Sequence, residues 1–292
     1  ILPASTGVIG AQLKMDLWEK AAPALAANLG KATPEDFARA IMTTDAFHKI
    51  SHREVSLPGG VVKLVGMAKG AGMICPNMAT MLSVVLCDAQ VEASVWQKML
   101  RDAVELTFNR VTVDGDTSTN DTLYGLANGA SGVSASDEES LKALSAALTS
   151  VLGDLAYMLV KDGEGASKVA RIHVAGAASD ADAERVARTV GHSQLVKTAL
   201  YGRDANWGRI VAAVGRSGAD FNPDDVVVTL CGVELFRKGQ PTDLDFDALL
   251  EEPLKQRDLP IDIVLGSGSG SYTLLASDLG HEYVNVNADY RS

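Results

Sequence analysis

Apolar residues recur at helical spacing in several segments of the chain. One of these segments is introduced by Thr33-Pro34-Glu35-Asp36, where a capping hydroxyl precedes a proline and two acids, a common start for a helix. The spacing predicts helices over residues 12–29, 34–42, 93–109, 137–160, 180–190, 193–201 and 206–214.

Short apolar runs, which are typical of buried strands, alternate with these helices. Because the two kinds of element intermix along the whole chain, we expect an α/β fold of the layered, α+β kind, with mixed sheets sandwiched by helices. The long helix ends in a glycine-containing turn, so we expect two packed subdomains, residues 1–165 and 166–292. The runs predict strands over residues 61–67, 81–87, 168–176, 225–236, 260–265 and 271–278.

The composition is that of a chain with a sizeable core. Hydrophobic residues make up 47% and charged residues 22%, which excludes wholesale disorder. A formal net charge of −11 argues against binding to nucleic acid or to an anionic membrane. No apolar run is expected to be long enough to cross a bilayer.

The cysteines and the first residues of the chain indicate the cellular compartment in which the protein is expected to work. Cys75, Cys87 and Cys231 are an odd number and form no CxxC pattern, which indicates a reducing, cytoplasmic setting without a disulfide framework or a zinc site. No histidine pair has metal-binding spacing, so no metal is expected. The opening Ile1-Leu2-Pro3-Ala4 lacks the features of a signal peptide and reads as a sequence that starts inside a longer one.

A polar stretch at residues 114–122 (DGDTSTNDT) invites a calcium interpretation. An EF-hand loop that began at Asp114 would need glycine where Thr119 stands and glutamate where Gly125 stands, so that interpretation fails. We expect its side chains to satisfy turn amides and to cap a following element. A role in lining a functional site is the alternative.

The run Gly266–Gly270 (GSGSG) resembles a phosphate-binding loop. It lacks the Lys-Ser/Thr of a P-loop and lies between two predicted strands instead of before a helix. A flexible hairpin connection is the expected structure. An anion-binding module built on this run is kept as a second class of function.

The segment of residues 69–82 (KGAGMICPNMATML) is unusual, because a glycine-rich loop leads to a threonine that opens an apolar strand. If the Ala79–Thr80 bond is cut, Thr80 gains a free α-amine beside its hydroxyl. That amine can act as the general base for the hydroxyl, which gives a nucleophile without a histidine. Taken alone, a threonine at a strand start is more often structural.

Further motifs resemble the ornithine acetyltransferase (glutamate N-acetyltransferase) family. They run in order over the whole chain, and several are long and rare. The matching segments are residues 5–10 (STGVIG), 42–45 (MTTD), 69–82, 114–122, 193–199 (SQLVKTA), 204–209 (DANWGR) and 287–292 (NADYRS).

The resemblance implies a self-cleaving enzyme of arginine biosynthesis. Its precursor is cut at Ala79–Thr80, and the two pieces stay together as α and β chains, with an α2β2 assembly suggested. An acetyl group moves from N-acetylornithine to glutamate by a ping-pong route through acetyl-Thr80. No cofactor is implied, and acetyl-CoA stays open as a second acetyl donor. Family members carry a sizeable portion before the Ser-Thr-Gly motif that this sequence lacks.

The resemblance also implies roles for individual residues. Thr80 is the nucleophile, and the Thr6 hydroxyl and Gly7 amide form the oxyanion hole. The nucleophile lies in the 1–165 part, and the 166–292 part closes the substrate site. The residues implied to bind substrate are Thr43, Lys69, Thr80, Glu164, Asn287 and Ser292.

Each of these roles has a structural alternative. Thr6-Gly7 is also a turn before a helix, Lys69 could be a solvated lysine, and Glu164 a solvent-facing acid of a turn. Thr43 could serve only a turn, and Cys75 is interpreted as a packing residue. Because chain ends usually fray, we expect Tyr283, Val284 and Val286 to hold the tail that bears Asn287 and Ser292. Within enzymes, an aminopeptidase or amidase of the same self-cleaving kind is the alternative activity.

Overall fold

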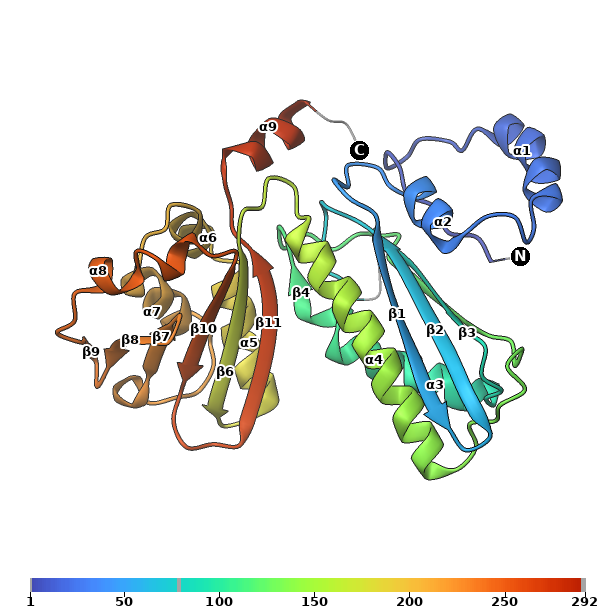
Figure 1. The fold of residues 1–292 in the computed structure, drawn as a ribbon. Coiled ribbons are helices and arrows are strands. Elements are labelled where there is room, and N and C mark those ends of the chain that lie inside the picture. Colours follow the sequence, from blue (N-terminus) through green and yellow to red (C-terminus); the bar gives the residue numbers. More distant parts are fainter. Residues whose placement is uncertain (1, 78–79, 290–292) are drawn as a thin grey trace.

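The computed structural model describes residues 2–77 and 80–289, which form two β-sheets with helices packed on them (Figure 1). This mixture confirms the predicted α/β class. The helices are α1 (Met15–Ala27), α2 (Pro34–Ala40), α3 (Ala93–Leu106), α4 (Glu138–Lys161), α5 (Asp180–Gly191), α6 (Gln194–Tyr201), α7 (Trp207–Gly215), α8 (Phe246–Leu250) and α9 (His281–Asp289).

The first sheet has the strand order β1-β2-β3-β5. Its strands are β1 (Lys49–Leu57), β2 (Gly60–Lys69), β3 (Leu82–Cys87) and β5 (Thr122–Ala127). The pairs β1–β2 and β2–β3 are antiparallel, whereas β3 and β5 run parallel. Helix α4 lies across β1 and β2, and Gly66 permits this close contact because a Cβ there would stand 2.6 Å from a methyl of Val151.

The second sheet has the strand order β4-β11-β6-β10-β7-β8-β9. In this sheet, strand β6 pairs in parallel with β10 and antiparallel with β11, while helix α5 packs on β6 and β11. Its strands are β4 (Val111–Thr112), β6 (Val169–Ala177), β7 (Val227–Leu230), β8 (Val233–Arg237), β9 (Gln240–Pro241), β10 (Asp258–Val264) and β11 (Gly270–Ser277).

The two sheets have separate hydrophobic cores that the chain nevertheless links. Buried residues of the first core run from Leu57 to Val169, and those of the second from Ala170 to Ala276. Strand β4 follows α3 in the first half but pairs with β11 at the edge of the second sheet. Because of this crossing, the division into domains at residues 165 and 166 stays a prediction.

Most predicted elements are confirmed, and the helix at Pro34 begins with a capping box between Thr33 and Asp36. The single strand expected over 225–236 is wrong: β7 and β8 form a hairpin there. Cys231 and Gly232 both have left-handed φ values, 50° and 82°, which is the backbone of a tight two-residue turn.

The expectation of a hairpin at Gly266–Gly270 is also wrong. Strands β10 and β11 do not pair with each other, because β6 lies between them. The connection crosses the end of β6 so closely that a Cβ on Gly268 would stand 2.0 Å from the carbonyl oxygen of Ala177. The Gly268 amide donates to Gly176, so these glycines serve a chain crossing, and this contact argues against an anion-binding module.

Helix α4 corrects the expectation that no apolar run could cross a bilayer. Over the described residues, this 24-residue helix has the length and mean hydropathy, 1.6, of a candidate membrane span. In the structure it packs on β1, β2 and α3, and Leu144, Leu148 and Leu155 are fully buried in the first core. Its apolar character is therefore that of a core helix.

Candidate active site

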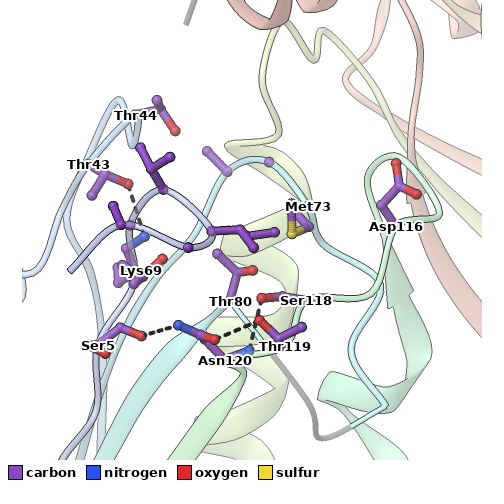
Figure 2. Close-up of a pocket in the computed structure, with 18 of the residues that line it drawn as sticks. Ser5, Thr43, Thr44, Lys69, Met73, Thr80, Asp116, Ser118, Thr119 and Asn120 are labelled. Atoms are coloured by element: carbon purple, nitrogen blue, oxygen red, sulfur yellow. Dashed lines mark hydrogen bonds between the residues drawn. The ribbon is translucent and has the colours of Figure 1, made fainter. Parts of the chain in front are cut away.

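A cavity of about 690 Å³ brings most of the predicted site residues together. The N-terminal segment, the end of β2, the residue Thr80 before β3, the 114–120 loop and helix α9 all contribute to its wall, and Figure 2 shows part of this lining. Ala79 and Ser292, which were also predicted, lie outside the described residues. The predicted residues on the wall are Thr6, Gly7, Thr43, Lys69, Thr80, Glu164 and Asn287.

Thr80 stands at the wall, two residues before the first residue of β3. Its hydroxyl oxygen is buried and has no hydrogen-bond partner among the described residues. The next residue is fixed on both sides, since the Met81 amide donates to Asp121 at 2.7 Å and the Met81 carbonyl accepts from the Thr122 amide at 2.8 Å. The backbone beside Thr80 is thus held firmly, while the Thr80 hydroxyl has no partner among the described residues.

The Thr6-Gly7 segment is held against the same wall by the side chain of Asn120, which lies in the polar stretch 114–122. The Asn120 amide donates to the carbonyl of Ser5 at 2.8 Å, and Figure 2 shows this contact close to Thr80. A turn bond from Ala11 to Val8 follows directly. The segment is therefore both the turn that precedes α1 and a part of the cavity wall.

Lys69 is a buried cation at the end of β2. It is only 2% exposed, which rules out the solvated-lysine alternative, and its Nζ donates to the Thr43 hydroxyl at 2.9 Å. Burial lowers the pKa of Lys69, opposed by the carboxylates of Asp45 and Glu164. A buried ammonium whose one partner in the described part of the chain is a neutral hydroxyl is well suited to bind an anion that enters the cavity.

Glu164 links three parts of the site. It accepts hydrogen bonds from the Thr44 hydroxyl at 2.9 Å and from the Asn287 amide at 2.8 Å. Gly72 lies directly against it, because a Cβ there would stand 2.4 Å from a carboxylate oxygen. Glu164 is therefore a half-buried wall residue, and the solvent-facing alternative does not hold.

The chain end is held only in part as predicted. Val284 is 62% exposed, so it does not anchor helix α9. Tyr283 does hold the helix, because its hydroxyl donates to Asp114 at 3.4 Å, and burial raises the pKa of that hydroxyl. A polar contact thus brings the helix that bears Asn287 to the cavity.

Three buried charges behind the wall were missed by the sequence analysis. The Nζ of Lys49 bonds to Asp45 at 2.6 Å and to Asp162 at 2.5 Å, and all three side chains are almost fully buried. Asp45 also accepts the amides of Thr43 and Gly70. This Lys49–Asp45–Asp162 cluster thereby fixes the backbone beside Thr43 and Lys69, and Asp162 precedes Glu164 by two positions.

The polar stretch 114–122 both satisfies amides, as predicted, and lines the cavity. Asp114 accepts the amides of Met73, Ile74 and Asp116. Burial raises the pKa of Asp121 to about 6, opposed by the bond from the Met81 amide. Cys75 is buried with a raised thiol pKa, in keeping with a packing role.

The arrangement combines a threonine hydroxyl, a buried cation and a carboxylate around one cavity. A small molecule with a carboxylate and an amine fits these charges, and an acyl group could be passed to the hydroxyl. Among the described residues, no group of three or more His, Cys, Asp or Glu side chains is arranged to hold a metal ion.

Comparisons with known proteins agree with one another. A family model described as the ArgJ family matches residues 1–292. The "Arginine biosynthesis bifunctional protein ArgJ" of Nitratidesulfovibrio vulgaris is 73% identical over 292 residues, which are 100% of this chain and 74% of that protein. The protein of the same name from Syntrophotalea carbinolica is 47% identical over 290 residues, 99% of this chain and 74% of that one.

A solved structure is also similar. The crystal structure of arginine biosynthesis bifunctional protein ArgJ from Bacillus halodurans, at 2.00 Å resolution, aligns with a TM-score of 0.66 and 36% sequence identity. The alignment covers 70% of this chain and 96% of that chain.

Proposed function

The chain belongs to the ArgJ family, and from this premise we propose that it is an acetyltransferase of arginine biosynthesis. It moves an acetyl group from N-acetylornithine to glutamate. The observation that carries the proposal is the cavity itself, which gathers the motif residues Thr80, Lys69 and Glu164 from distant parts of the chain. The family membership also confirms the resemblance found in the sequence.

The reaction runs in two half-reactions through acetyl-Thr80. The Thr80 oxygen attacks the acetyl carbonyl, the amide C–N bond breaks, and ornithine leaves as the amine. The α-amine of glutamate then attacks the ester and takes the acetyl group, which returns the hydroxyl. The Thr6 hydroxyl and the Gly7 amide stabilise the negative oxygen that forms in each half-reaction.

The charges of the site suit both substrates. N-acetylornithine and glutamate each present a carboxylate and an α-nitrogen, so a single pocket can hold them in turn. Lys69 binds the shared carboxylate, and Thr43 orients the ammonium group of Lys69. Glu164, with Asn287 at its side, holds an ammonium of ornithine or of glutamate, and the family resemblance adds Ser292 to the residues that bind substrate.

Thr80 becomes the nucleophile when the precursor cuts itself at Ala79–Thr80. The free α-amine then serves as the base for the neighbouring hydroxyl. The buried, unengaged Thr80 oxygen supports this step. The match to the solved structure covers 70% of this chain and 96% of that one, so the solved chain is about three quarters as long as this chain. Residues 80–292, the proposed β chain, are also about three quarters of this sequence. The length of the solved chain therefore suits a β chain that begins at Thr80.

Several finer points belong to the same proposal. Acetyl-CoA is a second donor, which suits the word "bifunctional" in the names of the relatives. No cofactor takes part, the pieces assemble as α2β2, and the enzyme works in the cytoplasm. The three cysteines, all free thiols, suit such a reducing compartment.

A hydrolase of the same self-cleaving kind is the alternative. It would release acetate from the acyl-enzyme whether or not glutamate is present. The buried Lys69 ammonium and the Glu164 carboxylate favour an amino-acid acceptor over water, since both would contact the acceptor.

Substitution of Thr80 tests the proposal. Thr80→Ala should remain one uncleaved chain on a denaturing gel and should transfer no acetyl group. Thr80→Ser should be cleaved at least in part, because it keeps a hydroxyl at the same position. Transfer by Thr80→Ala at the wild-type rate would refute the assignment of the nucleophile.

A further inference from the structure

Residues 113–122 bind the chain on both sides of the Ala79–Thr80 junction. On the upstream side, Asp114 accepts the Met73 amide at 2.7 Å and the Ile74 amide at 3.1 Å. The Val113 amide donates to the Ile74 carbonyl at 2.7 Å, and the Thr117 hydroxyl donates to the Cys75 carbonyl at 2.9 Å. The chain that leads to the junction is thus fixed at three consecutive residues.

The same segment holds the chain just after the junction. Asp121 Oδ1 accepts the Met81 amide at 2.7 Å, and the Thr122 amide donates to the Met81 carbonyl at 2.8 Å. The parallel pairing of β3 with β5 starts at the next residue, where Leu82 lies opposite Thr122. Residue 81 is therefore fixed through both its amide and its carbonyl.

Asp121 is a buried carboxylate whose only hydrogen bond among the described residues is to a backbone amide, which is unusual for a residue with a purely structural role. It is 8% exposed, it forms no salt bridge in the described part of the chain, and its Oδ2 has no partner there. A buried carboxylate without a cation costs stability, and an asparagine would accept the same amide without a charge. Retention of the charge at this position points to the reaction more than to the fold.

We infer that residues 113–122 form a junction clamp, in which Asp121 is a positioning residue for self-cleavage. The inference rests on the proposed self-cleavage. Asp121 holds the Thr80–Met81 peptide by a charge-assisted hydrogen bond, and Asp114 holds residues 73 and 74. With both flanks fixed, the Thr80 hydroxyl is kept in position to attack the preceding carbonyl, and such positioning supplies much of the rate of an intramolecular reaction.

The step that the clamp assists is an acyl shift followed by hydrolysis. The Thr80 oxygen bonds to the carbonyl carbon of Ala79, and the C–N bond between the two residues breaks. The hydroxyl proton ends on the Thr80 nitrogen, which becomes the free α-amine. One water molecule then hydrolyses the ester and restores the hydroxyl.

The test is the rate of precursor cleavage, followed on denaturing gels after pulse-labelled cell-free synthesis. Loss of a charge-assisted hydrogen bond should slow cleavage by Asp121→Ala about ten- to a hundredfold, and Asp121→Asn, which keeps an acceptor, should restore part of the rate. Asp88→Ala is the matched control. Asp88 also accepts a strand amide at 2.7 Å, from Lys63, but it follows the far end of β3.

Two measurements separate this inference from its alternatives. Thermal unfolding in a Thr80→Ala background, where no variant is cleaved, should show that Asp121→Asn is at least as stable as its parent, so that slower cleavage reflects positioning. Wild-type precursor that never cleaves would overturn the proposed function itself. Wild-type cleavage with an equally fast Asp121→Ala, or a loss as large in Asp88→Ala, would overturn only the clamp.

Discussion

At the scale of single residues, the site is marked by polar groups that are buried with fewer partners than they could use. Lys69 has one neutral partner, Asp121 has one free oxygen, and the Thr80 hydroxyl has no partner among the described residues. Such groups are costly to the fold unless a ligand or a reaction engages them. Each therefore yields a prediction with a defined direction.

Lys69→Ala should weaken N-acetylornithine and glutamate together. In the proposed function Lys69 binds a carboxylate that both substrates present, and loss of a charge-assisted hydrogen bond costs about 1.5–3 kcal/mol, or about ten- to a hundredfold. Steady-state kinetics of each half-reaction, normalised to the cleaved fraction, measures this effect. Lys63→Ala on the same strand is the control, since its exposed ammonium pairs with Glu54 outside the cavity.

If fully cleaved Lys69→Ala handles both substrates normally, Lys69 does not belong to the binding site. Loss in a single half-reaction would mean that the two substrates do not share this anchor.

Asp121→Asn should change how stability depends on pH. Burial raises the pKa of Asp121 from 3.8 to about 6, so between these values the folded protein binds more protons than the unfolded chain. Stability therefore falls as pH rises through this range, and the full penalty, up to about 3 kcal/mol, is present above pH 6. Asparagine removes the penalty.

The free energy of unfolding in urea is compared between Asp121 and Asp121→Asn, both in the Thr80→Ala background, at several pH values. The Asn variant should gain stability at pH 8, and the gain should shrink steadily toward pH 4. An equal gain at both pH values would show that Asp121 does not titrate in this range.

At the scale of elements, the Lys49–Asp45–Asp162 cluster ties three of them together: the loop before β1, the end of β2 and the end of α4. Lys49→Met leaves two carboxylates buried without their cation, so it should lower the free energy of unfolding by about 3–5 kcal/mol. Lys63→Met, which breaks an exposed pair, should cost at most about 1 kcal/mol.

Urea unfolding of the two variants provides the check. Similar small losses in both would mean that the buried cluster does not organise this part of the site.

Helices and strands whose apolar residues repeat regularly along the sequence were predictable. Elements whose structure depends on contacts with distant parts of the chain were not. Helix α4 and strand β6 follow from their own apolar patterns. Strand β1 was missed because its polar His52, Glu54 and Ser56 face away from the core, so no apolar run marks it. The prediction for the Gly266–Gly270 connection was wrong because its glycines are required by a close contact with the end of β6. That strand end lies about ninety residues earlier in the sequence, so the local pattern does not reveal the contact.

The site shows the same division. Thr80, Lys69 and Glu164 were found because they lie in motifs. Lys49 and Asp162 carried no local signal, because their significance depends on a contact between residues more than a hundred positions apart.

At the scale of the whole molecule, the cavity is assembled from both sides of the proposed cleavage point. Residues 1–79 supply Thr6, Gly7, Thr43 and Lys69, and residues 80–292 supply Thr80, Glu164 and Asn287. Strands β2 and β3 lie on either side of this point and pair from Leu64 with Cys87 to Lys69 with Leu82, so the two proposed pieces would stay joined through the first sheet and its core. Cleavage can therefore free the Thr80 amine without dispersing the site.

The most direct test of the central claim is the intact mass of the protein after incubation with N-acetylornithine alone. The account predicts two fragments, residues 1–79 and 80–292, with one acetyl adduct confined to the second. Addition of glutamate should remove the adduct and yield N-acetylglutamate. An adduct on the first fragment, or acetate release at the same rate with and without glutamate, would contradict acetyl transfer through Thr80.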